Sequence, residues 1–181
     1  HDSNLRPADW MLQLLLINEA LHNSSSHEVV NVLPYLKFSR QDRKDESRTS
    51  QSAKALVSII EPYANRGLTI DLHNPAIQGF YNIPFDNLYS SPTVAKHLRE
   101  HHANILEDLV VMSPDAGGAA RARAFAKKLG KEDIAIGYKI RPREGEVDGI
   151  RVLGDVRDRR VLIIDDIIDS GNTLVKAADA A

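Results

Sequence analysis

Apolar residues recur along this chain at two alternating spacings, one typical of helices and one typical of buried strands. Trp10, Leu14, Ile17 and Leu21 follow a helical spacing behind a proline, which predicts a helix over residues 7–23. The same spacing predicts helices over residues 52–64, 91–102 and 119–130, and a last helix that begins near residue 173. Short apolar runs between them predict strands over residues 28–36, 68–73, 108–114, 133–140 and 159–166.

The alternation of apolar strands with helices predicts the fold class. Strands that are apolar throughout are typical of parallel sheets covered on both faces, so we predict an α/β fold with parallel sheets flanked by helices. Ligands of such sheets bind beyond the carboxyl ends of the strands. The loops of greatest interest are therefore those around Arg40, His73, Asp115, Lys139 and Asp165. A strand, an acid, a small turn and a helix follow one another at both Asp115 and Asp165, which suggests two related α/β halves.

Composition narrows the classes of function. The 181 residues carry a formal net charge of -2, so no basic field favours nucleic acid or a membrane surface. The absence of cysteine excludes disulfides and thiolate metal sites. The longest apolar run near the start, residues 14–17, is too short to span a bilayer, so we expect a cytoplasmic protein. The start at His1 and the helical pattern that reaches Ala181 suggest a fragment of a longer protein.

The stretch VLIIDDIIDSGNTL, residues 161–174, carries the most distinctive chemistry. A buried strand delivers Asp165 and Asp166 to the edge of the sheet, and residues 169–173 then form a tight turn into a helix. Gly171 lets the backbone approach a ligand, and the amides of such a turn favour an anion such as phosphate. Two carboxylates would repel a bare phosphate, but they suit sugar hydroxyls or a hydrated magnesium ion. The stretch therefore predicts a sugar-phosphate site.

A purely structural role would also place a small polar turn before a helix. Ser170 or Thr173 could cap the helix that follows the buried strand. Capping alone does not require two acids at the end of the strand, so we favour the sugar-phosphate interpretation.

Two loops in the first half carry candidate chemistry with a plain structural alternative. Arg40, Gln41 and Asp45 lie in a run of charges that could hold phosphate oxygens or a base, although such runs most often form solvated loops. Asp71 and His73 would share one face of a strand end, where a carboxylate and a histidine can hold a divalent cation. A single histidine is more often only hydrogen-bonded.

Two loops in the second half have the same ambiguity. Asp115 opens a helix after a strand, so it could be an N-cap or a contact for metal or ribose. Lys139 and Arg141 end a strand before a polar segment. If both side chains are solvated, they need have no function. On a flap that closes over the site, they could contact phosphoryl oxygens as negative charge develops there in the transition state.

Residues 161–174 resemble the phosphoribosyl-pyrophosphate (PRPP) loop of the type I phosphoribosyltransferase fold, which phosphoribosyltransferases share with ribose-phosphate pyrophosphokinases (PRPP synthetases). Four further segments are similar to the PRPP synthetases in the same order, namely RQDRKDESR, DLHNPAIQGFYNIPFDNLY, SPDAGG and GEVDGIRVLGDVRDR. This ordered set covers nearly the whole chain and is more specific than one loop. It implies parts of two phosphoribosyltransferase-like domains, over residues 1–86 and 87–181.

The resemblance implies an activity and a division of roles. Pyrophosphate would pass from ATP to the anomeric hydroxyl of ribose 5-phosphate, giving PRPP and AMP, with Mg²⁺ as the cofactor. The implied roles are ATP binding by Arg40, Gln41 and Asp45; ribose 5-phosphate binding by Asp165, Asp166, Asp169, Ser170, Gly171, Asn172 and Thr173; metal binding by His73, Asp115, Asp71 and Asp86; and catalysis by Lys139 and Arg141.

The chain departs from the family pattern at two positions. The family often has an acid at the position of Asn82, and the loss of charge argues against a secondary cation site there. The family more commonly has a small residue at the position of Asn172. Asparagine tolerates left-handed backbone, so we expect the loop to keep its shape.

Two alternatives to this activity remain open. A phosphoribosyltransferase, which consumes PRPP, would share the loop at Asp165 but would have no reason to carry RQDRKD, DLH and SPDAGG. A non-catalytic regulatory subunit is disfavoured by the presence of Lys139, Arg141 and His73. The resemblance also implies a homo-oligomer, and a chain without the family's two end portions is expected to be weakly active or inactive alone.

Overall fold

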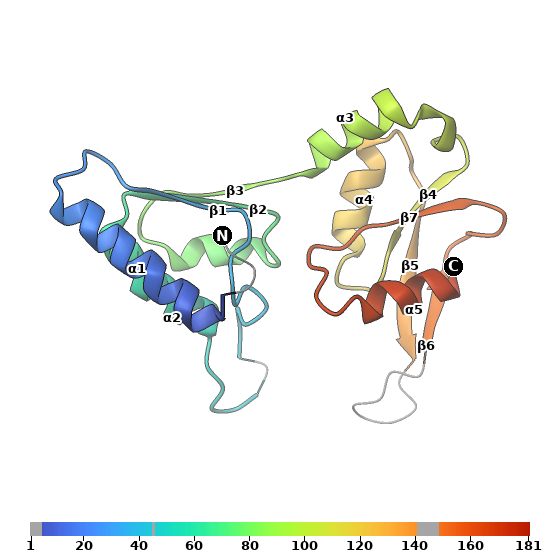
Figure 1. The fold of residues 1–181 in the computed structure, drawn as a ribbon. Helices are drawn as coiled ribbons and strands as arrows, with labels where there is room; N and C mark the ends of the chain where they lie inside the picture. Colours follow the sequence, from blue (N-terminus) through green and yellow to red (C-terminus); the bar gives the residue numbers. More distant parts are fainter. Residues whose placement is uncertain (1–4, 45, 141–148) are drawn as a thin grey trace. The chain divides into compact units, whose positions relative to one another are not determined.

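The structure is a computed structural model that describes residues 5–44, 46–140 and 149–181, without the side chain of Lys139. The chain divides into two compact units, His1–Tyr89 and Ser90–Ala181 (Figure 1). The units divide three residues after the predicted domain boundary, which stays a prediction. Each unit has its own sheet and its own core, and each is described separately below.

The first unit is built on a three-stranded parallel sheet in the order β1-β2-β3. Its strands are β1 (Val30–Leu33), β2 (Arg66–Ile70) and β3 (Phe85–Leu88). The helices α1 (Pro7–Asn23) and α2 (Ser52–Ile60) lie on one side of the sheet, with the short 3-10 helices η1 (Glu61–Tyr63) and η2 (Pro75–Phe80) (Figure 1). The other face of β1 carries exposed Val30 and Val32, so the described residues cover only one face, where two were predicted.

The helix α1 has the predicted bounds but a different buried face. Ile17 is 57 % exposed and Leu21 is 42 % exposed, whereas Trp10 and Asn18 are buried. The Asn18 side-chain amide donates to the carbonyl of Ile60 at 3.4 Å, which ties α1 to the end of α2. The helical spacing thus predicted the helix correctly. It predicted the buried face incorrectly, because a polar residue with a hydrogen-bond partner lies on the side that faces the core.

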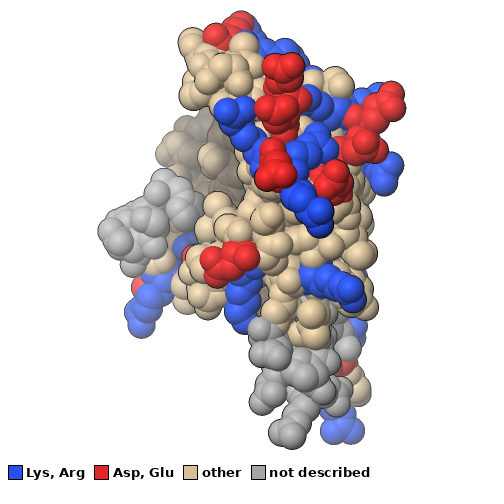
Figure 2. Space-filling view, turned by 90° about the vertical axis from the view of Figure 1, so that its right-hand side faces the viewer, with Lys and Arg blue, Asp and Glu red and all other residues tan. Residues whose placement is uncertain are grey.

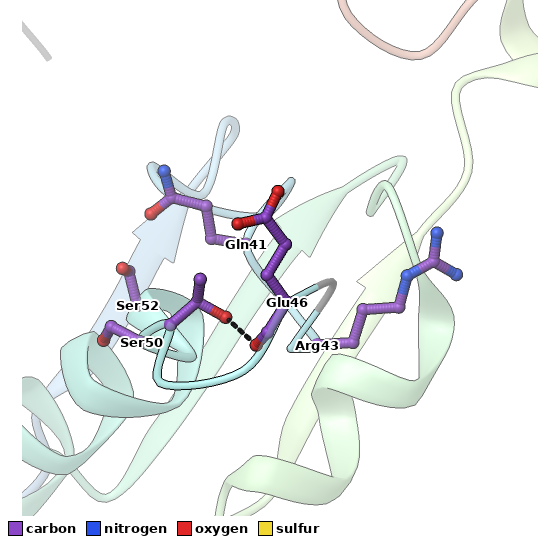
Figure 3. Close-up of a pocket in the computed structure, with 6 residues that line it drawn as sticks. Gln41, Arg43, Glu46, Ser50 and Ser52 are labelled. Carbon is purple, nitrogen blue, oxygen red and sulfur yellow. Dashed lines mark hydrogen bonds between the residues drawn. The ribbon is translucent and has the colours of Figure 1, made fainter. Parts of the chain in front are cut away.

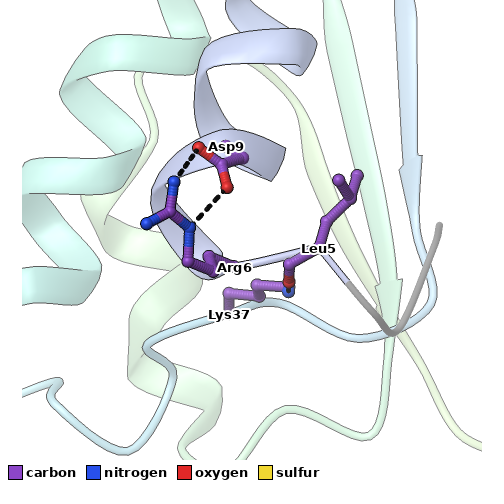
Figure 4. Close-up of polar contacts among 4 residues, drawn as sticks. All are labelled: Leu5, Arg6, Asp9 and Lys37. Atoms are coloured by element: carbon purple, nitrogen blue, oxygen red, sulfur yellow. Dashed lines mark hydrogen bonds and ion pairs between the residues drawn. The ribbon is translucent and has the colours of Figure 1, made fainter.

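Charged side chains fix the start of α1. Arg6 forms an ion pair with Asp9 at 2.8 Å across the first turn (Figure 4). The Lys37 ammonium, on the loop after β1, donates to the carbonyl of Leu5 at 3.3 Å and lies 5.7 Å from the centre of the Trp10 ring. These contacts hold the loop after β1 against α1.

The second unit has a four-stranded sheet in the order β6-β5-β4-β7. Its elements are α3 (Ser91–His101), η3 (Ala103–Ile105), β4 (Leu109–Ser113), α4 (Ala119–Lys128), β5 (Ile134–Ile140), β6 (Gly149–Leu153), β7 (Arg160–Ile163) and α5 (Asn172–Ala180). The fold class is confirmed, since β4 is parallel to both β5 and β7 and has helices on both faces. Val111 packs in one core with Ala122 and Phe125 of α4, and Met112 packs in another with Ala177 of α5.

The strand β6 runs antiparallel to β5 and was not predicted. Only residues 141–148 separate the two strands in the sequence. A parallel return needs a crossover of a dozen or more residues, so this connection permits only an antiparallel neighbour.

The end of β2 also differs from the prediction. The strand expected over residues 68–73 ends at Ile70, and Asp71 has a positive φ of 50°. The alternation of a strand therefore does not apply to Asp71 and His73, and the expectation that they share a strand face was wrong. The acids at Asp115 and Asp165 follow neighbouring strands of the same sheet, so both copies of the repeated pattern lie in the second unit.

Acidic and basic side chains intermix over the upper part of the face shown in Figure 2. In the second unit, acidic and basic residues make contacts at the starts of β4 and β7. Arg160 lies 3.6 Å from the carboxylate of Asp108, and the Lys131 ammonium donates to the carbonyl of Glu107 at 2.9 Å. These contacts hold the amino ends of the strands, opposite the edge where function was predicted. Among the described residues, no helix is both long enough and apolar enough to cross a bilayer.

Candidate functional site

The loop after β1 forms a tightly turned border to an open hollow. Phe38 has a positive φ of 63°, and the Gln41 amide donates to the Phe38 carbonyl at 2.8 Å. The Gln41 carbonyl accepts from the amide of Ala53 in α2 at 3.2 Å, so backbone hydrogen bonds fix the position of Gln41. The hollow has a volume of about 360 Å³ and is lined by Gln41, Arg43, Glu46, Thr49, Ser50 and Ser52 (Figure 3).

The residues that line this hollow all have polar or charged side chains, and a hydrogen bond within the loop holds two of them. The Thr49 hydroxyl donates to the Glu46 carbonyl at 2.8 Å, while the Arg43 side chain points away from Ser50 and Ser52 (Figure 3). Serine hydroxyls and amide groups can hydrogen-bond a polar ligand, and an arginine at the edge can hold phosphate oxygens. Arg40 is exposed next to Gln41.

The segment after β2 is held by backbone and side-chain hydrogen bonds from β3. The Asp71 amide donates to the carbonyl of Leu88 at 2.8 Å. The Leu72 amide donates to the side-chain oxygen of Asn87 at 3.0 Å, and Leu72 is buried. His73 is exposed and Asp71 is half-buried, so both remain within reach of solvent at the carboxyl edge of this sheet.

Two residues near β3 already form an ion pair or hydrogen bonds with other side chains. The Arg66 guanidinium donates to the Asp86 carboxylate at 3.0 Å from Nε, and the hydrogen bond raises the pKa of Arg66. Asp86, expected to help bind metal, is thus an ion-pair partner of Arg66. The backbone amide and the side-chain amide of Asn82 both donate to the Glu61 carboxylate at 2.8 Å. An acid at this position would face Glu61 and form a two-carboxylate site, which Asn82 replaces with hydrogen bonds.

In the second unit, the loop between β4 and α4 folds on itself. The Asp115 carboxylate accepts from the amide of Gly118 at 3.1 Å, and the Ser113 hydroxyl donates to the Asp115 carbonyl at 2.6 Å. Gly118, rather than Asp115, is the N-cap of α4, so the N-cap alternative for Asp115 was wrong. A β-carbon at Gly137 of β5 would lie 2.5 Å from the Pro114 carbonyl oxygen, so this loop lies directly on β5.

Negative charge accumulates where β7 ends. Burial raises the pKa of Asp165 to about 6, with further increases from the neighbouring carboxylates of Asp166 and Asp115. The Asp166 amide donates to the Asp165 carboxylate at 2.9 Å, which partly opposes the increase. Arg121 of α4 lies 3.7 Å from the Asp166 carboxylate and supplies a positive charge. Three carboxylates from the loops after β4 and β7 therefore influence one another at the carboxyl edge of the sheet.

The turn after these acids has the shape of an anion site. Gly171 has a φ of 78° and is the N-cap of α5, and no side chain caps this helix. The alternative in which Ser170 or Thr173 serves as the cap is therefore not supported. Asn172 is the first helical residue, and the left-handed conformation falls on Gly171 instead. The amides of the first turn of α5 thus face the loop without a side-chain cap, which favours an anion.

Several predicted residues lie outside the described part of the chain. Asp45 and Arg141 are among them, and for Lys139 only the backbone, within β5, is described. Within the described residues, no group of three histidine or acidic side chains is arranged to hold a metal ion. Mg²⁺ usually keeps several waters and takes only one or two protein carboxylates, so the acids at Asp115, Asp165 and Asp166 still fit it chemically.

Sequence reasoning missed residues that orient the candidate groups. Asn87 and Asn74 hold the segment that carries His73, and Arg121 pairs with Asp166. The signal used to find candidate residues was an acid or a glycine directly after a strand. None of these three residues has that signal. Their roles depend on contacts between residues 15 to 45 positions apart in the sequence.

Comparison with known proteins agrees with this arrangement. Residues 84–181 match the model of the phosphoribosyl transferase domain, and residues 2–63 match that of the N-terminal domain of ribose phosphate pyrophosphokinase. The phosphoribosyl transferase match covers just over half of the chain and includes the whole second unit, with its parallel strands β4, β5 and β7. The chain belongs to the ribose-phosphate pyrophosphokinase family.

Individual relatives have the same family name. Ribose-phosphate pyrophosphokinases from Hyphomonas neptunium and Rhizobium meliloti are 43% and 46% identical over 95% of this chain and 55% of their own length. The crystal structure of phosphoribosylpyrophosphate synthetase from Mycobacterium smegmatis matches with a TM-score of 0.88 and 31% identity, over 99% of this chain and 57% of that chain. The chain thus spans about half the length of the curated relatives it matches.

Proposed function

We propose that this chain is the part of a ribose-phosphate diphosphokinase that contributes to binding ATP and ribose 5-phosphate. The reaction transfers pyrophosphate from ATP to the anomeric hydroxyl of ribose 5-phosphate, giving PRPP and AMP. The observation that carries the proposal is the pair of acids at Asp165 and Asp166, followed by the left-handed Gly171 at the start of α5, in a chain of this family. Carboxylates for a sugar and amides for a phosphate occur there in the order that a ribose phosphate needs.

The turn after β7 is assigned to ribose 5-phosphate. The amides and hydroxyls of residues 169–173 hold the phosphate, while Asp165 and Asp166 accept hydrogen bonds from the ribose hydroxyls. The N-cap of α5 supports this role, because Gly171 has no side chain to bond the amides of the first turn.

The loop after β1 is assigned to ATP. Arg40 and Gln41, with Asp45, bind the nucleotide beside the polar hollow of about 360 Å³. Arginine holds phosphate oxygens bidentately and can stack on a base, so it suits both parts of ATP.

Magnesium binding is assigned to carboxylates and a histidine of the candidate loops. Asp115 in the second unit and Asp71 and His73 in the first have the donor types for Mg²⁺ held partly through water. Asp86 is a weaker candidate because it already pairs with Arg66. When bound, Mg²⁺ supplies positive charge that neutralises the phosphate oxygens.

Lys139 and Arg141 are assigned to the transition state. Pyrophosphoryl transfer needs positioning and positive charge more than covalent help from the protein. The backbone of β5 carries Lys139 to the carboxyl edge of the sheet, the same edge as the acids after β4 and β7. We further propose a cytoplasmic homo-oligomer, as the family resemblance implies.

The test is AMP release from ATP and Mg²⁺, with and without ribose 5-phosphate, by the longest natural protein that contains this sequence and by this chain. We expect AMP release from the longer protein to require ribose 5-phosphate and to fall about a thousandfold in Lys139→Ala. The matched control is Lys127→Ala, on the exposed side of α4. PRPP consumption without AMP release would indicate a phosphoribosyltransferase instead, and an inactive folded longer protein would indicate a regulatory subunit.

A further inference from the structure

A buried carboxylate joins the loop after β1 to the segment after β2. Asp42 is only 8 % exposed although it lies within a run of exposed charged residues. Its carboxylate accepts a hydrogen bond of 2.5 Å from the side-chain amide of Asn74, which is 32 positions further along the chain. The backbone carbonyl of Asp42 also accepts from the side chain of Gln51 at 3.2 Å. Burying a carboxylate without hydrogen-bond partners costs free energy. The contact with Asn74 therefore stabilises the buried position of Asp42.

Asn74 uses both ends of its amide. Its oxygen accepts from the amide of Ala76 at 3.0 Å and caps η2, while its nitrogen donates to Asp42. Asn74 is therefore fixed in orientation, because exchanging the oxygen and nitrogen would break both hydrogen bonds. A residue held in this way can transmit the position of one loop to another.

The two joined residues are direct neighbours of candidate ligand-binding groups. Asp42 follows Gln41, which borders the hollow, and Asn74 follows His73. The Asp71–Asn74 segment starts from a backbone turn with positive φ at Asp71 and is anchored by Asn87 at Leu72. Beyond Leu72, the Asn74 side chain ties the segment to the loop after β1 through its hydrogen bond to Asp42.

We propose that Asp42 and Asn74 are positioning residues that couple the nucleotide loop to the His73 segment, so that ATP and its divalent cation bind cooperatively. This inference rests on the proposed function, because it takes Arg40 and Gln41 as ATP ligands and His73 as a cation ligand. Neither Asp42 nor Asn74 contacts substrate in this role. Ordering one loop by ATP lowers the entropic cost of ordering the other for the cation.

The contact can be broken and rebuilt by exchanging donor and acceptor. Asn74→Asp keeps an oxygen to cap η2 but places a second carboxylate against Asp42. The double variant Asp42→Asn with Asn74→Asp restores one donor and one acceptor with their positions exchanged. We expect the single variant to disturb the contact and the double variant to repair it.

The measurement is the affinity of this chain for a fluorescent ATP analogue, with and without Mg²⁺, at a temperature where Trp10 fluorescence shows every variant folded. We expect Asn74→Asp to weaken binding in Mg²⁺ by about tenfold and to remove most of the gain in affinity that Mg²⁺ gives the unaltered chain. The double variant should recover both. A merely structural role would lower the melting temperature without changing the effect of Mg²⁺.

Two controls separate this inference from the proposed function. Asn104→Asp makes the same change on exposed η3 and should change affinity by less than about twofold. Arg40→Ala tests the nucleotide site itself and should weaken ATP binding whether or not the coupling exists. Binding that is lost in Arg40→Ala but keeps its full Mg²⁺ effect in Asn74→Asp overturns the coupling alone. No ATP binding by the unaltered chain, or no loss in Arg40→Ala, overturns the assigned nucleotide site and the coupling together.

Discussion

The two units build their candidate sites in different ways. In the second unit, the acids and the anion turn are shaped by neighbours in the sequence: Asp115 bonds to Gly118, Asp165 to Asp166, and Gly171 begins α5. In the first unit, the candidate groups are held by side chains from distant parts of the chain, as Asn74 bonds to Asp42 and Asn87 to Leu72. Local turns shape most of the second site, where Arg121 adds one long-range ion pair to Asp166, whereas the His73 segment of the first depends on long-range polar contacts.

The electrostatic consequences also differ. Acids of the first unit have partners of opposite charge or amide donors, such as Arg66 for Asp86 and Asn82 for Glu61. In the second unit, Asp165 lies near two other carboxylates, and its pKa rises to about 6. Removing the Asp165 carboxylate should therefore stabilise the second unit, whereas removing that of Asp86 should not stabilise the first.

The largest expected effect follows from the close approach of β5 to the loop after β4. In Gly137→Val, the β-carbon would meet the Pro114 carbonyl oxygen at 2.5 Å, where neither backbone can easily move. We expect the second unit to lose about 3 kcal/mol of unfolding free energy, measured by urea titration with circular dichroism. Trp10 fluorescence, which reports the first unit, should keep its midpoint. The control Gly79→Ala, which has open space at the β-carbon, should leave both transitions in place.

The next effect concerns the crowded acids. The folded pKa of Asp165, about 6, lies above its ordinary value of 3.8, so its ionised form destabilises the folded state. Its contribution to stability is fully present below pH 3.8 and is lost as the pH rises through 6. We expect Asp165→Asn to raise the unfolding free energy at pH 7.5 by about 1 kcal/mol, after allowing for solvent screening of a half-buried group.

This gain should shrink between pH 6 and pH 3.8, which thermal unfolding at several pH values can follow. Asp86→Asn is the comparison in the first unit and should give no gain at any pH. A gain for Asp165→Asn that does not vary with pH would show that the ionisation of Asp165 is not its cause.

A smaller effect is expected where an amide replaces a carboxylate. Asn82→Asp would set a negative charge against Glu61 in place of the side-chain hydrogen bond of 2.8 Å, while the backbone amide of residue 82 could still donate. We expect a loss of about 0.5 kcal/mol at neutral pH that millimolar Mg²⁺ reverses. The double variant with Glu61→Gln should be insensitive to Mg²⁺. If Mg²⁺ has no effect on Asn82→Asp, the two carboxylates do not form a cation site.

The smallest effect is expected at the exposed ion pair of β2 and β3. Arg66→Gln removes the partner of Asp86, but both side chains are about half exposed. Exposed ion pairs contribute little, so the melting temperature should stay unchanged within error. A marked loss of stability would mean that Asp86 is a structural acid and should be withdrawn as a cation ligand.

The sequence predicted elements best where periodicity and local chemistry agree. The bounds of α1 were predicted as found, and the turn at Gly171 was predicted from its residue types. The strands β3 and β6 were missed, since β3 includes Asp86 and Asn87 and β6 includes Gly149 and Arg151. Neither shows the continuous apolar run that marked the other strands.

Residues of the candidate sites could likewise be predicted where a local sequence signal marks them, and not elsewhere. The acids after β4 and β7 could be found because they directly follow apolar strands that share one edge. The contact of Asp42 with Asn74 could not, because it joins two loops through side chains and leaves no periodic signal. For Asp71, periodicity was misleading, since β2 ends at Ile70, three residues before the predicted end, and Asp71 has a positive φ.

We propose residues 165–173 as a sugar-phosphate site, and direct binding of ribose 5-phosphate tests this proposal. Calorimetric titration of this chain should show binding of ribose 5-phosphate and none of ribose at the same concentration. Ser170→Glu, which adds a negative charge in the exposed turn, should abolish binding, while Thr93→Glu on the exposed side of α3 should not. Equal binding by the folded Ser170→Glu variant, or no binding by the folded unaltered chain, would contradict the proposal.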